Sequence, residues 1–293
     1  MILVIGDLIL DDYRIIDINR ISPEAPCLVG KHIDEYYRLG GAANVANNIK
    51  VLTDELLLVG ECCKDTMHPL LCEAEIPNLV KYGKNSTKVR FIDKKTRTQV
   101  FRYDVEEVES KEHPTELMHD FPTLPPHDYS VQVIVDYLKG TINKVAQVKC
   151  PINLFSTKNP YPSRLIKHKN EHNILVLNKG EFNNADKESL KEFSYIVRTE
   201  GEEGISLFHA LSLLIIKNFE ALKVDVFDVT GAGDTVTAVL AFCLSHFGFS
   251  EENLARACFC ANVEAAKVIT MHGTTVVTST KRDIIEMFQR LEY

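Results

Sequence analysis

The sequence predicts an α/β protein in which a mostly parallel central sheet is joined by a second, smaller sheet. Short, continuous apolar runs suit strands that are buried on both faces. These runs alternate with segments of helical apolar spacing, the pattern of βαβ units. Two stretches, at about residues 12–38 and 88–104, interrupt this alternation, and the second alternates apolar and polar residues as a half-buried sheet does. We therefore expect one domain over residues 1–293, with the small sheet as an excursion from it.

The first half of the chain opens with Ile-Leu-Val-Ile-Gly at residues 2–6, which fits a buried strand closed by a glycine. Residues 42–52 have helical apolar spacing, and residues 55–60 read as the next strand. Prolines and charges make residues 106–128 the least regular part of the chain, with a charged helix expected near residues 115–119.

The second half resumes the parallel-sheet pattern. Strands are expected at residues 131–135, 152–155, 174–177 and 195–197, with a further pair at 213–216 and 224–227. Helical spacing follows at residues 235–247, 250–270 and 281–290.

Composition excludes several classes of protein. Of 293 residues, 45% are apolar and 25% charged, as in ordinary globular proteins. The net charge of −8 offers no basic footprint for nucleic acid. The apolar run after Met1 is too short for a signal peptide or a membrane span, so we expect a cytoplasmic protein without a nucleic-acid or membrane partner. The 8 cysteines form no Cys-x-x-Cys pair, which indicates reduced thiols.

The strongest local signal is the run Val224-Asp-Val-Phe-Asp-Val-Thr-Gly-Ala-Gly-Asp234, which leads from a predicted strand into an apolar helix. Gly231 and Gly233, with Ala232 between them, allow a tight turn whose N–H groups can hold a phosphoryl group. Asp234 would face that group and accept the proton of an attacking hydroxyl. An Asp in a first helical turn is also a common cap, but the strand–turn–helix context favours a catalytic base.

A second glycine-rich run, Leu39-Gly-Gly-Ala-Ala-Asn44, also precedes a predicted helix. Gly40 and Gly41 would let a compact polar ligand press against the backbone while Asn44 hydrogen-bonds to it. Close packing of helix against strand explains the same small residues equally well, so both interpretations stand.

Polar side chains follow two predicted strands at the edge where open α/β sheets bind ligands. Asp7 and Asp11 lie just past the first strand, where they can accept hydrogen bonds from sugar hydroxyls or remain solvated loop acids. Asn178 and Glu181 follow the strand at 174–177. Glu181 could act through water on a phosphate-bound Mg²⁺, although both residue types are also common at helix starts.

Together these motifs make the chain resemble the ribokinase-like carbohydrate kinases, also called the phosphofructokinase B family, over nearly its whole length. The opening strand with Asp11, Gly40-Gly41-x-x-Asn44, Asn178-x-x-Glu181 and Gly231-Ala-Gly-Asp234 occur in the family's order. The resemblance implies a three-layer sandwich with a β-sheet lid that often serves as a homodimer contact. It also implies ATP as phosphoryl donor, with Mg²⁺.

The same resemblance implies roles for individual residues. The sugar would be bound by Asp11, Gly40, Gly41 and Asn44, and the nucleotide site would be lined by Asn178, Glu181, Thr199, Gly201, Gly204 and Asn262.

Within the family, the chain is most similar to the D-glycero-D-manno-heptose 7-phosphate kinases, including the kinase half of bifunctional ADP-heptose synthases. This likeness rests on Arg20-Ile-Ser-Pro-Glu-Ala-Pro26, Asp136-Tyr-Leu-Lys-Gly140, and Cys258-Phe-Cys-Ala-Asn262 with the downstream Gly273-Thr274. It implies that the anomeric hydroxyl of a heptose 7-phosphate is the acceptor.

An acceptor that already carries a phosphate needs cations. Arg20, Arg102 and Lys139 are the candidates; Arg is favoured because its planar fork can pair with two phosphate oxygens. Each of the three is equally compatible with an ordinary surface ion pair.

One run departs from the heptose kinases. Where they have Asp-Pro-Lys-Gly after a central strand, this chain has Phe155-Ser-Thr-Lys-Asn159, so a carboxylate is missing and Lys158 alone is shared. Two alternatives therefore stand: a kinase of another sugar, or a sugar-phosphate-binding or regulatory protein that has lost turnover. No nucleotidyltransferase segment follows Tyr293, so we expect later steps on the product to belong to other proteins.

Overall fold

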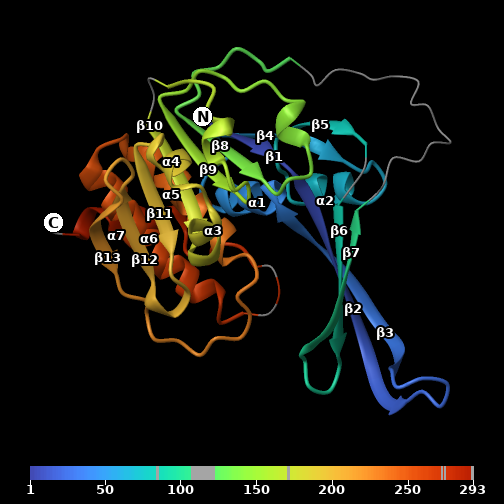
Figure 1. Cartoon of the computed structure of the whole chain (residues 1–293). Helices are drawn as coiled ribbons and strands as arrows, with labels where there is room; N and C mark the ends of the chain where they lie inside the picture. The colour runs from blue at the N-terminus through green and yellow to red at the C-terminus, as the bar shows by residue number, and fades with distance from the viewer. Residues whose placement is uncertain (84–85, 107–122, 170–171, 272, 274, 292–293) are drawn as a thin grey trace.

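The chain folds into three layers, with helices on both faces of a large sheet and a second sheet projecting from one end (Figure 1). This computed structural model describes residues 1–83, 86–106, 123–169, 172–271, 273 and 275–291. Within those ranges, no helix is long and apolar enough to cross a membrane. The predicted α/β class, with a mostly parallel sheet and a smaller second sheet, is confirmed.

The central sheet is 9-stranded, in the order β13-β12-β11-β10-β9-β8-β1-β4-β5. All pairs from β5 to β11 are parallel, and the last two pairs are antiparallel. Parallel strands end at one edge, so the residues that follow them gather there. The strands are β1 (Ile2–Gly6), β4 (Leu56–Cys62), β5 (Asn78–Tyr82), β8 (Val131–Asp136), β9 (Ile152–Thr157), β10 (His172–Asn178), β11 (Tyr195–Thr199), β12 (Ile205–His209) and β13 (Leu214–Phe219).

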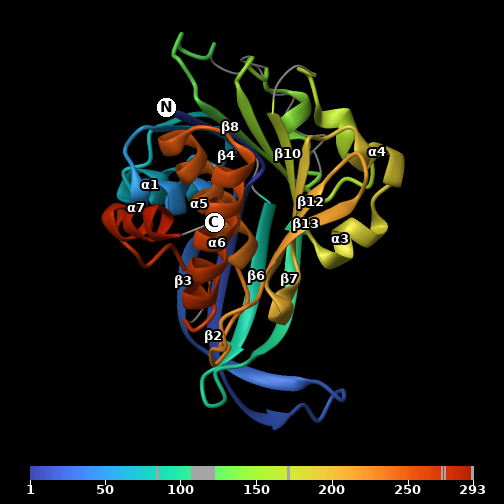
Figure 2. The same cartoon turned by 90° about the vertical axis from the view of Figure 1, so that its left-hand side faces the viewer.

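Helices bury the two faces of this sheet in separate apolar cores, and Figure 2 shows the two layers on either side of it. One face carries α1 (Ala42–Leu52), α5 (Ala232–Phe247), α6 (Glu251–Val268) and α7 (Lys281–Arg290), with the short α2 (Met67–Glu73) contributing to the same core. The other carries α3 (Lys179–Asn184), α4 (Lys187–Lys191), η1 (Thr141–Asn143) and η2 (Pro162–Leu165). The remaining short helix, η3 (Gly201–Glu203), follows β11. Helix α5 is buried along most of its length, which fixes the position of its first turn.

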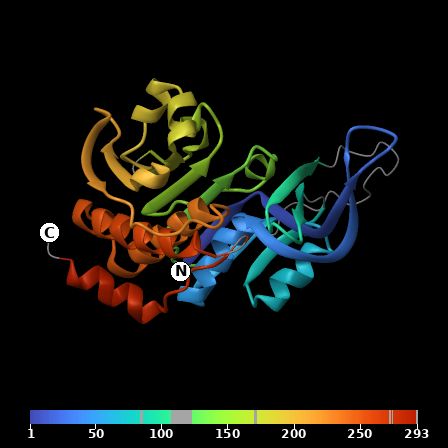
Figure 3. The same cartoon turned by 90° about the horizontal axis from the view of Figure 1, so that it is seen from below.

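The lid is a 4-stranded sheet in the order β3-β2-β6-β7. Its strands are β2 (Leu8–Ile21), β3 (Leu28–Gly41), β6 (Ser86–Asp93) and β7 (Gln99–Glu106). Figure 3 shows this sheet at one end of the body, with the β2–β3 hairpin reaching outward. Both predicted excursions lie within it, and β2 begins earlier than predicted because it leaves the central sheet directly after Asp7.

Residues 224–227, which we predicted as a strand, form none, so that prediction is wrong. The chain has left the sheet edge at Phe219, and Val226 and Phe227 are exposed, so the alternating sequence has no neighbouring strand to pair with. The N–H groups of Phe227 and Asp228 instead donate to the carbonyl of Ile269 at 2.8 and 3.1 Å.

Most of the other predicted strands and helices are confirmed. The strands β5 and β12 were missed. The charged helix expected near residues 115–119 lies outside the described residues. All the cysteines are free thiols, as predicted.

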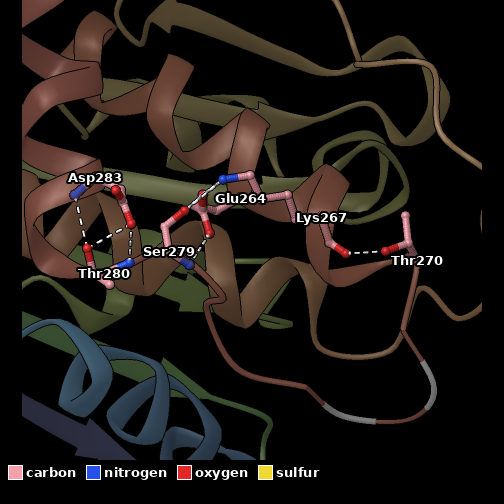
Figure 4. A network of polar contacts seen from close by, with 6 residues as sticks. All are labelled: Glu264, Lys267, Thr270, Ser279, Thr280 and Asp283. Carbon is pink, nitrogen blue, oxygen red and sulfur yellow. Dashed lines mark hydrogen bonds and ion pairs between the residues drawn. The ribbon is translucent and has the colours of Figure 1, made fainter.

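A buried carboxylate, Glu264, anchors the connection from α6 to α7 (Figure 4). Glu264 is 0% exposed and accepts from the Ser279 hydroxyl at 2.6 Å and from the Lys267 ammonium at 2.7 Å. Because Ser279 lies just before α7, these bonds fix the end of the connection against α6. The same connection reaches the candidate site, where the Gly273 N–H donates to Asp228 at 3.1 Å.

Candidate active site

A pocket of about 260 Å³ opens where the lid meets the strand ends of the central sheet. Its lining includes a first group of predicted site residues: Asp11, Gly41, Asn178, Glu181, Thr199, Gly231, Gly233 and Asp234. It also includes residues that were not predicted to belong to the site: Lys88, Arg90, Tyr137, Ser156, Lys158, Val176, Leu177 and Thr230.

Asp234 lies in the first turn of α5 and is 8% exposed. Its Oδ2 accepts from the Asn44 amide at 2.8 Å, and its Oδ1 accepts from the Tyr137 hydroxyl at 3.1 Å. Burial raises the pKa of Asp234 to about 6, while the bonds from Asn44 and Tyr137 act in the opposite direction. A carboxylate that titrates just below neutral pH, at a pocket wall, can take a proton and release it again.

Asn44 is placed by a network of buried amides between α1 and α5. Asn48, one turn further along α1, donates to the Asn44 carbonyl at 2.8 Å and accepts from Thr235 at 3.1 Å. The same Asn48 oxygen accepts from the N–H of Val277 at 2.8 Å. The network explains why Asn44 and Asn48 can be buried among the apolar residues of α1, because each amide has partners.

The turn before α5 is built around Asp228 and Gly231. Asp228 accepts from the Thr230 N–H at 2.9 Å, and Gly231 has φ 87°, a conformation that favours glycine. The Ala232 N–H is engaged by the Val229 carbonyl at 3.3 Å. The N–H groups that follow belong to the first turn of a helix, where no preceding carbonyl is in reach, so they suit an anion.

A methyl group at Gly233 would meet no atom within 4 Å, so this side of the turn is open to a ligand.

Asp11 is 3% exposed and pairs with Arg90, whose Nη2 lies 2.8 Å from Asp11 Oδ1. It is therefore a buried acid on β2 rather than a solvated loop acid. A methyl group on Gly40 would lie 2.6 Å from Asp11 Oδ2, and one on Gly41 would lie 2.5 Å from the Asp7 carbonyl. Both glycines are thus required by packing, and Gly41 additionally lines the pocket.

The run from Asp136 to Gly140 is held by Asp7. Its carboxylate accepts from the N–H groups of Tyr137 at 2.8 Å, Lys139 at 2.9 Å and Thr141 at 3.1 Å. Asp7 thereby fixes the backbone that carries Tyr137, and with it the hydroxyl that contacts Asp234.

The predicted nucleotide residues are spread over β10, α3, β11, η3 with the residue after it, and α6. Asn178 caps α3 in a capping box with Glu181, whose N–H donates to Asn178 at 2.8 Å. Thr199 ends β11 at the pocket wall, and Gly201 and Gly204 follow it in turns with positive φ.

A methyl group on Gly204 would lie 2.0 Å from the Phe219 carbonyl, so packing alone requires this glycine. Asn262 lies on α6 outside the pocket and donates to the Glu220 carbonyl at 2.8 Å. It thereby holds the segment that leads to a second cavity of about 640 Å³, lined by residues 223–227 and Thr270.

Glu181 is the one predicted metal residue. Its Oε2 accepts from the Asn178 N–H at 2.9 Å, and among the described residues no three acidic, His or Cys side chains gather as a metal cage would require. In kinase sites, Mg²⁺ is held mainly by substrate phosphates and water, with one or two carboxylates. The pocket therefore fits such an ion with Glu181 as an outer partner.

The three predicted phosphate-binding cations lie outside the pocket lining. Arg20 is exposed near the outer end of β2, and Arg102 on β7 pairs with Asp104 at 2.8 Å. Lys139 pairs with Glu106. Their roles stay predictions.

Lys88, Arg90, Tyr137 and Lys158 were missed as site residues. Lys88 and Arg90 are two apart on β6 and so share a face of the lid, a pattern visible in sequence, but the sequence does not show which face meets the pocket. Tyr137 belongs to the run Asp136–Gly140, and Lys158 belongs to the run Phe155–Asn159 that departs from the heptose kinases. Neither run indicated a role for these two side chains.

Comparison with solved structures shows which class of protein has this fold. A nucleoside kinase of Methanocaldococcus jannaschii, described as an archaeal member of the ribokinase family, aligns over 99% of this chain and 98% of its own, with TM-score 0.69 and 19% identity. Ribokinase of Thermotoga maritima aligns over 99% of both chains, with TM-score 0.67 and 16% identity. The fold is therefore ribokinase-like.

Sequence relatives narrow this class. The model of the pfkB family carbohydrate kinases matches residues 159–281. Bifunctional protein HldE of Campylobacter jejuni is 33% identical across 100% of this chain, and that of Histophilus somni is 30% identical across 96%. The chain is thus similar to the pfkB family carbohydrate kinases, and the three comparisons together support a carbohydrate kinase. The chain spans 65% and 62% of the length of these two relatives.

Proposed function

We propose that the chain transfers the γ-phosphoryl group of ATP to the anomeric hydroxyl of D-glycero-D-manno-heptose 7-phosphate, giving heptose 1,7-bisphosphate. One observation carries the proposal: a buried carboxylate, Asp234, stands inside the glycine turn that starts α5 and faces an open pocket. The bifunctional HldE relatives and the runs shared with heptose 7-phosphate kinases support the choice of sugar.

Asp234 acts as the general base. The acceptor hydroxyl donates its proton to the carboxylate as its oxygen attacks the phosphoryl group, which lies against the N–H groups of the Gly231–Gly233 turn. Asn44 and Tyr137 hold the two carboxylate oxygens, so the base is oriented before the acceptor arrives. On the acceptor side, Asp11 is positioned to accept hydrogen bonds from sugar hydroxyls.

The donor occupies the side of the pocket that is lined by Asn178, Glu181 and Thr199. The adenine ring of ATP would extend toward the second cavity along residues 223–227, because that segment runs directly into the Asp228 turn. When bound, Mg²⁺ neutralises charge on the transferred phosphoryl group. Glu181 would hold one of the waters around that ion.

A second candidate function is favoured by Ser156. This pocket residue stands where the heptose kinases have an aspartate, so the chain has lost one acidic group beside Lys158. A protein that binds the sugar phosphate without turning it over is consistent with that loss.

ADP release, measured against a panel of phosphorylated and free sugars, tests the proposal. Heptose 7-phosphate should give the highest kcat/KM. A different sugar with the highest value would overturn the choice of acceptor but leave the kinase. Saturable binding of heptose 7-phosphate with no ADP release from any sugar would favour the second candidate.

A further inference from the structure

Two lysines meet around one tyrosine ring in the pocket. The Lys88 ammonium lies 5.1 Å from the centroid of the Tyr137 ring, and the Lys158 ammonium lies 4.6 Å from it. Lys88 comes from strand β6 of the lid, whereas Lys158 follows β9 in the central sheet. Among the residues that the structure describes, neither ammonium forms an ion pair with a carboxylate.

The two lysines share this part of the pocket with Arg90 and with the acids Asp11 and Asp234. Desolvation lowers the pKa of Lys88, and the positive charges of Lys158 and Arg90 lower it further, while Asp11 and Asp234 act in the opposite direction. Cations that share a partly dehydrated pocket repel one another unless an anion lies between them. The arrangement therefore favours a negatively charged ligand.

Arg90 adds a buried donor. Arg90 lines the pocket and is 6% exposed, and its Nη2 pairs with Asp11. Its Nε is buried and has no hydrogen-bond partner among the described residues. Buried N–H groups are almost always paired in native proteins, so an acceptor oxygen from a ligand is expected there.

We propose that Lys88, Lys158 and Arg90 bind the phosphate that the acceptor sugar already carries. The ring that the lysines flank belongs to Tyr137, whose hydroxyl contacts Asp234. The site is thus suited to an acceptor that presents a hydroxyl to Asp234 and a phosphate to the cations. This assignment rests on the proposed kinase function and replaces none of its steps. It also makes the phosphate a bridge between the lid and the central sheet.

Equilibrium binding tests the assignment without requiring turnover. The Lys88→Met and Lys158→Met variants remove charge but keep an apolar contact with the ring, and Lys95→Met, in the loop that joins β6 to β7, is the matched control. Calorimetry would compare heptose 7-phosphate with the same heptose lacking phosphate. We expect each pocket variant to weaken binding of the phosphorylated sugar by about 10–100-fold, the range for a lost charged hydrogen bond, with the free heptose and the control unchanged.

A second measurement shows whether the cations bind the phosphate of the sugar or the phosphates of ATP. With ATP varied, each pocket variant should keep its KM for ATP within about 2-fold of the wild type. A large rise in that KM, with sugar binding unchanged, would assign the cations to the donor and overturn the proposal. Equal losses for both sugars would overturn it as well.

Failure of the proposed function would look different. Phosphate-dependent binding that the variants abolish, in a wild-type protein that releases no ADP, would contradict the kinase function and support the cation site.

Discussion

Asp234 is where burial and hydrogen bonding act in opposite directions on one carboxylate. Burial raises its pKa to about 6, and the bonds from Asn44 and Tyr137 limit that rise. A general base works in its deprotonated form, so kcat/KM should increase as the pH rises through about 6. Tyr137→Phe removes one bond to the charged form and should move this limb to higher pH.

The pH dependence of kcat/KM between pH 4.5 and 8 measures this shift. Tyr161→Phe, on an exposed ring, is the control. An unmoved acidic limb in Tyr137→Phe would show that the tyrosine does not hold the base.

The same carboxylate should cost stability. Since the pKa of Asp234 is raised in the folded state, the folded protein holds its proton more tightly than the unfolded chain does. The free energy of unfolding therefore falls as the pH rises from about 4 through about 6, and the cost is complete above that. Asp234→Asn removes it, so the variant should exceed the wild type by about 1–3 kcal/mol at pH 7.5 and by much less at pH 4.

Urea unfolding at both pH values checks this. The surface variant Asp65→Asn, which makes the same charge change, should show no such difference. A stability gain that is independent of pH would contradict the raised pKa.

Some residues of the site could be predicted and others could not. Asp234 was found because a glycine turn before an apolar helix is a local pattern. The cations Lys88 and Arg90 were missed because their role depends on how the lid meets the central sheet, which no local pattern encodes. Arg102 was chosen in their place; it lies opposite Arg90 on the neighbouring strand but is exposed and paired with Asp104.

At the scale of elements, the connection from α6 to α7 depends on Glu264. Replacing it by Ala would leave the N–H of the buried Ser279 without its acceptor, whereas the partly exposed Lys267 keeps its bond to the Ser279 hydroxyl. We expect a loss of about 1–3 kcal/mol, the cost of an unsatisfied buried donor. Because the connection also reaches Asp228, catalytic activity should fall in parallel at temperatures where the protein remains folded.

Thermal and urea unfolding of Glu264→Ala measure this loss. Glu286→Ala breaks two ion pairs on the exposed face of α7 and should cost no more than about 1 kcal/mol. Equal effects of the two variants would show that burial of Glu264 is unimportant.

Elements with a strong local pattern of apolar residues could be predicted, and elements that depend on a neighbouring strand could not. The run at residues 2–6 is apolar throughout and became β1, buried at every position. By contrast, residues 224–227 alternate as an edge strand would but have no neighbour beyond β13. Strand β12 was missed because it follows β11 after only the short η3 turn, and that turn carries no helical pattern.

The whole molecule presents an apolar surface on the lid that the active site does not use. Phe101 and Tyr103 on β7 are 60% and 55% exposed. Arg102, which stands between them, pairs across the sheet with Arg90, and Arg90 faces the pocket. Phe101 and Tyr103 therefore lie on the outer face of the lid. The predicted homodimer would bury this face, and Phe101→Asp with Tyr103→Asp should convert dimers to monomers.

Sedimentation equilibrium distinguishes these states. Leu214→Asp, at an exposed apolar residue on the far edge of the central sheet, is the control. A wild-type monomer, or a lid variant that remains dimeric, would contradict the prediction.

The central claim for the molecule is that Asp234 removes the proton of the attacking hydroxyl. The most direct measurement is kcat of Asp234→Asn with ATP and heptose 7-phosphate, both at saturation. We expect kcat to decrease by about 10²–10⁴, with the KM for ATP nearly unchanged, because the amide keeps the shape of the site but cannot accept the proton. A kcat close to that of the wild type would contradict the claim.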